Sequence, residues 1–258
     1  MVNQKNKVII ITQARVGSKR FHSKITKPIG NETVLSIHLK RLLKSKLANK
    51  IIVATTFEKD ISRIINIAKK CNVECFQGST NDVLDRYYQA AKLYRPEYIV
   101  RVTSDCPLID PKLLDKLIGF IMKNKCDYVS NILVPNYPDG QDIEVFKFKA
   151  LKIAHEKAEL NTDREHVTSY IENNSTFRGI ETFKSKMYPS IAKYENVRMT
   201  IDHKDDYKAI DFIVSKLGIN KSWVTYAEFI INNQQMFSNQ NYIRNESYIK
   251  SVKDQNYG

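Results

Sequence analysis

The stretch VIIITQARVGSKRFHSK, residues 8–24, joins a short apolar run to a loop rich in positive charge. Residues 8–11 are apolar and β-branched, which is typical of a buried strand. The loop that follows, residues 12–24, carries four cationic side chains, one glycine and no acid. In open α/β sheets, ligands lie beyond the carboxyl ends of the strands. This stretch therefore predicts a first strand that delivers positive charge to a ligand-binding edge.

Patterns typical of strands and helices alternate from this stretch to about residue 130. Short apolar runs predict strands at residues 51–54, 73–76, 98–100 and 128–130. Apolar residues at helical spacing predict helices over residues 35–43, 61–68, 78–94 and 111–124. Asp110, followed by Pro111, has the residue types of a helix N-cap and a first helical position. The alternation predicts an α/β fold with a mainly parallel sheet flanked by helices.

The alternation breaks at about residue 137. YPDGQDIEVF, residues 137–146, predicts a turn and a strand, and a helix follows it. REH, residues 164–166, is predicted in the first turn of a helix, and VRMTID, residues 197–202, is predicted as a strand. The end of the chain, rich in Asn and Gln, is expected to form helices or a tail. Because no linker interrupts the sequence, we expect a single domain over residues 1–258.

The net charge of +13 is concentrated near one end of the chain. Residues 1–50 hold twelve Lys and Arg residues and one acid, whereas the other 208 residues hold 29 basic and 27 acidic ones. A nucleic-acid-binding protein is one interpretation of such an excess, but no recognition helix is evident. A compact polyanion such as a triphosphate suits charge gathered beside one loop at least as well. Part of the excess belongs to a solvated helix face.

Composition and cysteine usage favour a globular, cytoplasmic protein. Hydrophobic residues make up 42% of the chain, which is not the composition of a disordered protein. The N-terminal apolar run is too short for a signal peptide, and no stretch approaches the ~20 apolar residues of a membrane helix. The cysteines form no zinc-binding pattern with one another or with histidines, so reduced thiols are expected. They are Cys71, Cys75, Cys106 and Cys126.

The basic loop has the residue types of a phosphate-binding site. Gly17 permits a ligand to approach the backbone closely, and Ser18 and the backbone N–H groups can donate to phosphate oxygens. Arg15 supplies a planar guanidinium. Three further cations follow it, namely Lys19, Arg20 and Lys24. The spacing of a Walker A loop is absent. The alternative is a solvated loop between a strand and a helix, but four cations without an acid favour phosphate.

Two aspartates that follow predicted strands have the chemistry of magnesium ligands. Asp105 lies in RVTSDCPLIDP, after the strand at residues 98–100, and Asp202 ends VRMTID. Mg²⁺ prefers one or two carboxylates together with phosphate oxygens. The structural alternatives are a turn residue for Asp105 and a cap of the helix that follows for Asp202.

The second half of the chain contains two pairs of polar residues with open roles. Asp142 and Glu144 are predicted on one face of a strand, where they either grip substrate hydroxyls or keep an edge strand soluble. The pattern around Arg164 and His166 indicates surface residues of a helix.

Seven fragments, taken in order, make the chain similar to a known family. They are QARVGSKRFHSK, DVLDRYYQAA, RVTSDCPLIDP, YPDGQDIEVF, REHVTSYI, RMTIDHKDDY and RNESYIKS, and they span nearly the whole chain. They resemble the SpsF-type (spore coat polysaccharide biosynthesis) cytidylyltransferases, relatives of the CMP-KDO and acylneuraminate cytidylyltransferases. The resemblance implies a GT-A-like (Rossmann-like) nucleotidyltransferase fold that uses CTP and Mg²⁺. It also implies a nucleotide-binding half, residues 1–135, and an acceptor-binding half with a C-terminal helical tail, residues 136–258.

The resemblance assigns roles to individual residues. It implies catalytic roles for Arg15, Lys24 and Asp105, and a metal site made by Asp105 and Asp202. The nucleotide-binding residues would be Gln13, Ala14, Arg15, Gly17, Ser18, Lys24, Arg86 and Thr103. The acceptor-binding residues would be Asp142, Glu144, Arg164 and His166. One departure precedes Lys24, because Phe21-His22-Ser23 stand where the family often has Leu-Pro-Gly.

The implied reaction is attack of an acceptor oxygen on the α-phosphorus of CTP, with release of pyrophosphate. The implied partners are CTP and a small anionic acceptor, without nucleic acid or membrane, and the acylneuraminate relatives suggest a homodimer. Two alternatives stay open. One is a GT-A glycosyltransferase that consumes a sugar nucleotide, against which the lack of a clear DxD motif argues. The other is a non-catalytic nucleic-acid-binding protein.

Overall fold

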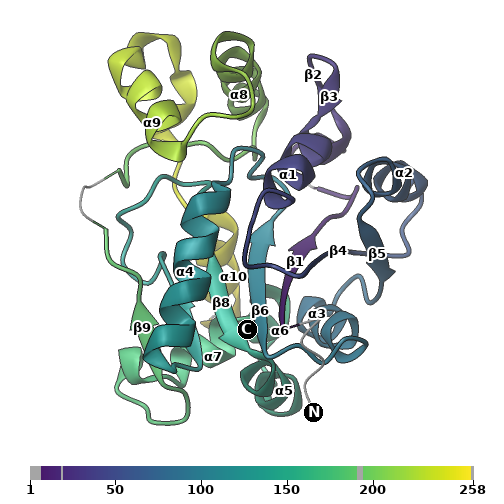
Figure 1. Cartoon of the computed structure of the whole chain (residues 1–258), viewed down its shortest axis with the longest axis vertical. Helices are drawn as coiled ribbons and strands as arrows, with labels where there is room; N and C mark the ends of the chain where they lie inside the picture. Colours follow the sequence, from purple (N-terminus) through teal and green to yellow (C-terminus); the bar gives the residue numbers. More distant parts are fainter. Residues whose placement is uncertain (1–6, 19, 191–193, 257–258) are drawn as a thin grey trace.

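A computed structural model of the chain describes residues 7–18, 20–190 and 194–256, and its centre is a seven-stranded sheet. The strand order is β5-β4-β1-β6-β8-β7-β9 (Figure 1). The strands are β1 (Val8–Gln13), β4 (Lys50–Thr55), β5 (Glu74–Gln77), β6 (Tyr98–Thr103), β7 (Tyr128–Ser130), β8 (Glu144–Lys147) and β9 (Ser185–Met187). Only β8 runs antiparallel to its neighbours β6 and β7. The mainly parallel α/β fold predicted from the sequence is confirmed.

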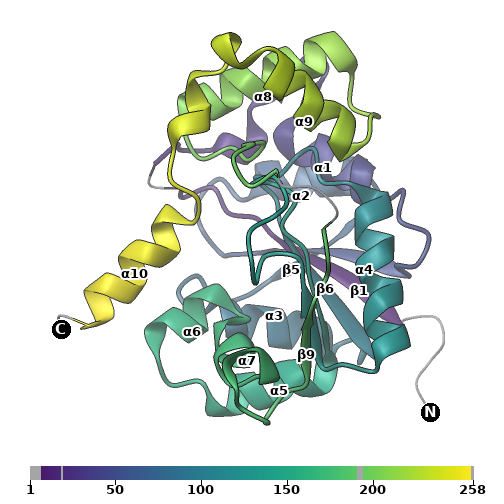
Figure 2. The same ribbon diagram turned by 90° about the vertical axis from the view of Figure 1, so that its left-hand side faces the viewer.

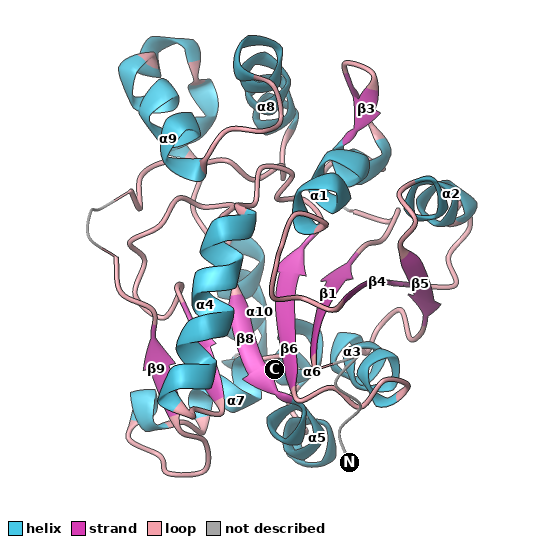
Figure 3. Ribbon diagram, in the orientation of Figure 1, coloured by secondary structure: helices cyan, strands magenta, loops and turns pink. Residues whose placement is uncertain are grey.

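Helices cover both faces of this sheet, as Figure 3 shows. One face packs on α1 (Val34–Leu42), α2 (Ser62–Lys70) and α4 (Pro111–Asn124). The same core continues into α8 (Lys204–Leu217) and α9 (Trp223–Asn232), which lie beyond the sheet at the top of Figure 1. The other face packs on α3 (Val83–Lys92), α5 (Phe148–Lys157) and α7 (Ser169–Asn173). Side chains of β1 alternate between the two cores, with Val8 and Ile10 in one and Ile9 and Ile11 in the other. Burial on both faces explains why this strand is an unbroken apolar run.

Short elements complete the chain. They are η2 (Lys24–Thr26), the hairpin of β2 (Pro28–Ile29) and β3 (Glu32–Thr33), α6 (Asn161–His166), η3 (Thr176–Arg178), η4 (Gln234–Met236), η5 (Ser238–Asn241) and α10 (Glu246–Asn256). In Figures 1 and 2, α10 extends away from α8 and α9 and lies beside α6. Across residues 7–18, 20–190 and 194–256, no helix combines the length and the apolar character needed to cross a membrane.

Helix starts in the first half follow local sequence signals. Asp110 caps α4 as predicted, because its Oδ1 accepts from the N–H groups of Lys112 and Leu113 over 2.8 and 3.1 Å. Its other oxygen accepts from Trp223 N at 2.9 Å, which fixes the start of α9. One cap therefore positions two helices.

Two local predictions in the second half are wrong, and one structural alternative is excluded. Residues 197–202, all described, form no strand, and only an isolated bridge joins Arg198 to Asp139. Arg164 and His166 lie in the last turn of α6, not in the first turn of a helix, because Val167 (φ 65°) breaks the helical path. The alternative role of Asp202 as a cap of α8 is excluded, because the N-cap of that helix is His203.

The predicted pairing of Asp142 with Glu144 on one strand face is also wrong, because β8 begins only at Glu144.

Candidate active site

The carboxyl ends of β1 and β6 lie side by side and carry the two loops that begin the site. The pairing register places Gln13 opposite Thr103. His38 of α1 spans the loops, with one ring nitrogen 3.0 Å from Thr12 Oγ1 and the other 2.9 Å from the Cys106 carbonyl. Burial lowers the pKa of His38 to about 4, so the ring is a neutral spacer. The sequence analysis did not single out this residue.

Lys24 joins the two aspartates predicted as metal ligands. Its Nζ is 2.8 Å from Asp105 Oδ2 and 2.8 Å from Asp202 Oδ1, and its side chain is 10% exposed. Burial alone would raise the pKa of Asp105, but the Lys24 ammonium holds it well below its usual range. Burial also disfavours the charge on Lys24, yet Asp105 and Asp202 raise its pKa. Residues 81 and 178 positions apart thus form one charged cluster.

Two arginines complete the contacts of Asp202. Arg20, from the basic loop, donates to Asp202 Oδ1 over 2.6 Å and to Glu246 of α10 over 3.1 Å. Arg198 reaches Asp202 Oδ2 at 3.3 Å. Both oxygens of this carboxylate therefore face cations of the chain. The remaining cation of the basic loop, Lys19, lies outside the described residues.

Close backbone contacts hold the loop of Asp202 against the loop of Asp105. Ile201 N donates to the Asp105 carbonyl over 2.9 Å. Nearby, Met199 N donates to the Asp139 carbonyl over 2.6 Å. Gly140 has φ +106°, and a Cβ there would lie 2.7 Å from the Met199 carbonyl carbon. Only glycine allows this approach, so the DG pair in YPDGQDIEVF helps to bring Asp202 to the sheet.

Arg198 is the centre of a buried ion-pair network that the sequence analysis missed. Its guanidinium contacts Asp139 Oδ2 at 2.6 Å and both oxygens of Asp206 at 2.8 and 3.0 Å. Burial would lower the pKa of Arg198, but Asp206, Asp139 and Asp202 raise it. Asp206 also accepts from the backbone N–H groups of Asp202 and His203 at 2.8 Å each. Arg198 therefore positions the segment that carries Asp202.

The basic loop is more open than this network. Arg15 and Gly17 are exposed, whereas Ala14 is buried and donates its N–H to the Ala54 carbonyl over 3.1 Å. Ser18 N donates to the Val16 carbonyl over 2.8 Å. Glu58, on the loop after β4, points a carboxylate oxygen at Gly17 N over 3.4 Å. An acid of the chain thus lies where the backbone offers a donor to an anion.

Arg86 and Gln13 hold buried polar atoms beside this loop. Arg86 of α3 donates to the Ser79 carbonyl over 2.6 Å, while its Nε has no hydrogen-bond partner among the described residues. Burial lowers the pKa of Arg86, and the charge of Arg15 adds to that effect. Gln13 Oε1 is likewise buried without a partner in the described part of the chain. The Nε–H of Arg86 can donate to an anion, whereas Gln13 Oε1 can only accept a hydrogen bond.

Asp142 and Glu144 each pair with an arginine. Asp142 binds Arg244, which also donates to the Tyr137 carbonyl over 2.8 Å. Burial raises the pKa of Asp142, and Arg244 opposes that rise. Glu144 binds Arg101. Arg244 begins the fragment RNESYIKS, so the sequence marked its neighbourhood without assigning it a role.

Arg164 and His166 have partners in different parts of the fold. Arg164 binds the carboxylate of Asp82, the N-cap of α3, over 3.0 Å from its Nε. His166 packs on α10, with Nε2 3.0 Å from Ser251 Oγ and its ring 4.9 Å from that of Tyr248. Burial lowers the pKa of His166, and nearby Arg101 lowers it further. The structure brings His166 near the Glu144 region and ties Arg164 to α3.

The aspartate pair fits a divalent cation. Asp105 and Asp202 converge on one point, because a single ammonium contacts an oxygen of each at 2.8 Å. In residues 7–18, 20–190 and 194–256, no group of three or more His, Cys, Asp or Glu side chains could hold a metal by itself. Mg²⁺ is commonly bound by one or two carboxylates plus substrate phosphates and water. The donor set therefore suits a metal that arrives with phosphate.

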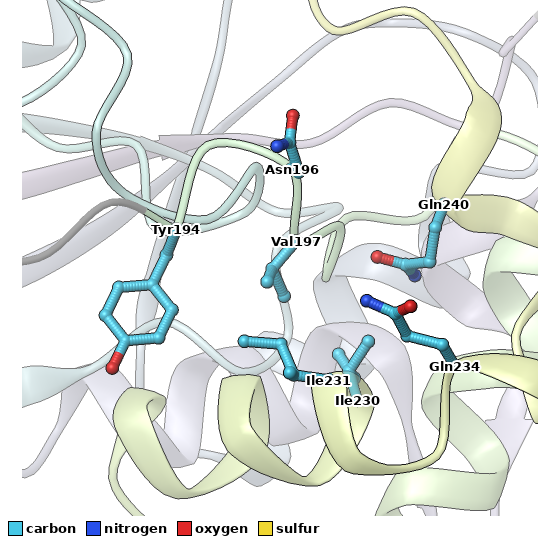
Figure 4. A pocket seen from close by; sticks show the side chains of 7 residues that line it. All are labelled: Tyr194, Asn196, Val197, Ile230, Ile231, Gln234 and Gln240. Atoms are coloured by element: carbon cyan, nitrogen blue, oxygen red, sulfur yellow. The ribbon is translucent and has the colours of Figure 1, made fainter.

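A separate cavity lies between the segment of Tyr194 to Val197 and the end of α9 (Figure 4). Its volume is about 220 Å³, and it is lined by Tyr194, Asn196, Val197, Ile230, Ile231, Gln234 and Gln240. It contains no charged side chain and is smaller than the roughly 300–1,000 Å³ of typical ligand pockets. It does not suit a triphosphate.

Comparison with known proteins gives consistent matches over most of the chain. The profile of a family described as "Cytidylyltransferase" matches residues 9–243. The chain is 31% identical to the spore coat polysaccharide biosynthesis protein SpsF of Bacillus subtilis, over 83% of this chain and 88% of SpsF. It is 42% identical to an uncharacterised protein of Methanocaldococcus jannaschii, over 78% of this chain and 81% of that protein.

A solved structure is similar over nearly the full length. It is a cytidylyltransferase from Leptospira borgpetersenii with 36% sequence identity and a TM-score of 0.85, and the match covers 92% of this chain and 99% of that one.

Proposed function

This chain belongs to the cytidylyltransferase family, and we propose that it transfers CMP from CTP to a phosphorylated or sugar-acid acceptor. Pyrophosphate is the second product, and the similarity to SpsF supports a role in making precursors of surface polysaccharides. The observation that carries the proposal is the convergence of Lys24, Asp105 and Asp202 beside the exposed loop of Arg15 and Gly17. As a CTP-dependent nucleotidyltransferase, the protein is neither a non-catalytic nucleic-acid binder nor a glycosyltransferase.

The basic loop binds and orients the triphosphate. Arg15 and Lys24 supply cations. Gly17 N donates to a phosphate oxygen once the Glu58 carboxylate moves away from it. Negative charge spreads over the α-phosphoryl group and the departing pyrophosphate in the transition state, and fixed cations stabilise it there. Arg86, with a buried and unpartnered Nε, adds a donor beside the same loop.

Asp105 and Asp202 would hold Mg²⁺. When bound, the metal neutralises and orients phosphate oxygens. The protein's own contribution is to hold the two carboxylates ionised and in place. Lys24 keeps the pKa of Asp105 low, and Arg198 positions the segment of Asp202. A hard cation requires this charge, so both carboxylates must stay deprotonated.

The acceptor is proposed to bind on the side of Asp142, Glu144, Arg164 and His166, in residues 136–258, while residues 1–135 hold the nucleotide. An acceptor oxygen forms a bond to the α-phosphorus as the bond from that phosphorus to the bridging oxygen of pyrophosphate breaks. A phosphate acceptor is already ionised and needs no base, whereas a sugar hydroxyl must lose a proton. In-line positioning supplies most of the catalysis.

Nucleotide preference tests the proposal. With Mg²⁺ present, CTP should raise the melting temperature more than ATP, GTP or UTP, because a ligand at a hundred times its dissociation constant stabilises the native state by about 2.7 kcal/mol. Equal shifts for all four nucleotides would remove the cytidine assignment.

A second assay, pyrophosphate release from CTP with panels of sugar acids and of sugar and alditol phosphates, identifies the acceptor class. We further propose a cytoplasmic homodimer, which light scattering of the purified protein tests.

A further inference from the structure

We propose that Lys24 occupies the metal position in the free enzyme, so that a divalent cation binds productively only when a nucleotide draws the lysine away. This inference rests on the proposed function, because it assumes that Asp105 and Asp202 hold the metal. It concerns the order and coupling of binding, which the proposed function leaves open.

The geometry places the ammonium at the point where the two carboxylates meet. Lys24 Nζ lies 2.8 Å from an oxygen of each, and the side chain is 10% exposed. A metal ion bound by both carboxylates must lie in the same small volume. The two cations therefore exclude one another by space as well as by charge.

Cations of the chain already contact both carboxylates that a metal would use. Lys24 and Arg20 pair with Asp105 and Asp202, while the charge of Arg198 is shared among Asp139, Asp202 and Asp206. These contacts are Lys24 with both aspartates, Arg20 with Asp202 at 2.6 Å, and Arg198 with Asp139 at 2.6 Å and with Asp206 at 2.8 Å. A divalent ion that enters this cluster meets repulsion instead of two free carboxylates. Metal affinity of the free enzyme is lowered accordingly.

A triphosphate provides the alternative partner that Lys24 requires. The lysine belongs to the same loop as Arg15 and Gly17, and its flexible four-carbon stem allows the ammonium to move without a shift of the backbone. When Lys24 turns to phosphate, the two carboxylates lose their cation and gain affinity for a metal. Because such coupling is reciprocal, the metal strengthens nucleotide binding by the same factor.

The test measures Mn²⁺ binding to nucleotide-free protein by the electron paramagnetic resonance signal of free Mn²⁺. Lys24→Met should bind Mn²⁺ at least about tenfold more tightly than wild type, because loss of the ammonium frees both carboxylates and removes the repulsion between two cations. Lys24→Gln, which keeps a polar end, should show the same gain if the methionine variant folds poorly. Lys27→Met is the matched control, since Lys27 contacts the Phe21 ring, and it should bind like wild type.

Further measurements distinguish failure of this inference from failure of the proposed function. In the Lys24→Met background, Asp105→Asn should abolish the gain, which ties it to this carboxylate pair. Melting shifts with Mn²⁺ and CTP together should be larger in wild type than the sum of the separate shifts. Equal Mn²⁺ affinity of wild type and both Lys24 variants, with normal binding in the presence of CTP, would overturn the inference alone. Lack of Mn²⁺ binding by every protein, with and without CTP, would instead overturn the metal site of the proposed function.

Discussion

Arg15 and Arg198 carry the same side chain, yet they lie in opposite surroundings. Arg15 is exposed on the basic loop. The Arg198 side chain is 4% exposed and contacts three carboxylates, those of Asp139, Asp202 and Asp206. The first cation is available to a ligand, and the second is already neutralised and builds the site. Lys24 combines both situations, because it is buried and paired but belongs to the loop that faces the ligand. The comparison separates charges that act on substrate from charges that hold the protein in shape.

The largest effect on stability should come from removing Arg198, the buried cation of this comparison. Arg198→Ala leaves Asp139 and Asp206 as buried acids without their cation, and loss of one partner from a buried ion pair costs about 3–5 kcal/mol. We expect a clear fall in the denaturant midpoint of unfolding together with loss of activity. Arg63→Ala, on α2 and exposed, is the matched control and should unfold like wild type. An Arg198→Ala protein as stable as wild type would show that the network is not structural.

The metal pair is the next test. Asp105→Asn and Asp202→Asn keep side-chain size but lose the charge that a hard cation requires, so turnover should fall about 10²–10³-fold. The melting temperature should fall less than in Arg198→Ala, because in each variant Lys24 keeps the other aspartate as its partner. The double variant should lose little beyond the worse single one, because residues that act as a unit are non-additive. Asp205→Asn is the control, since Asp205 pairs with Lys208 at 2.9 Å outside the cluster. Full turnover of either variant at ordinary Mg²⁺ would return that aspartate to a structural role.

Arg15→Ala tests the exposed cation of the comparison. Removal of one cation aimed at the phosphates should lower turnover by roughly 10²-fold. The melting temperature should stay near that of wild type, because the side chain is exposed. Steady-state kinetics and a thermal melt on the same preparation check both parts. A drop in stability with normal turnover would place Arg15 with the structural cations instead.

The smallest effect concerns Glu58, the acid that faces the basic loop from the loop after β4. Glu58→Gln removes a negative charge that lies 3.4 Å from Gly17 N, where the triphosphate is proposed to bind. CTP affinity should improve a few-fold, since interactions between exposed charges contribute at most about 1 kcal/mol. The gain should shrink in high salt. Titration of CTP by calorimetry at two salt concentrations measures this, and weaker binding would mean that Glu58 helps to hold the nucleotide.

The first half of the fold was predictable because its signals are local. Helical spacing and short apolar runs predicted β1, β4, β5 and β6 and helices α1 to α4. The cap by Asp110 depends on residues two and three positions away, so the sequence alone specified it. The positive loop after β1 was evident from composition. That residues 1–258 form one domain, and that its halves divide nucleotide from acceptor, stay predictions.

The second half could not be predicted in the same way. Residues 197–202 have strand-like alternation, yet Arg198 and Thr200 are as buried as Val197, because an ion-pair network covers the polar side. No local period reveals that Arg198 meets Asp139, 59 positions away. Likewise, the resemblance named Asp142 and Glu144, but not the arginines that pair with them.

The sequence by itself determined the order of strands and helices in the first half of the chain, and the residue types that follow β1 and β6. These features follow from side-chain periodicity and residue type, which act over a few positions. Only the tertiary structure decided that Lys24 lies between Asp105 and Asp202, and that Glu58 faces Gly17. Such contacts depend on how loops from distant strands meet, which is set by sheet register and by close approaches such as that of Gly140 to Met199. A charged residue can be recognised in a sequence, but its partner is chosen by the fold.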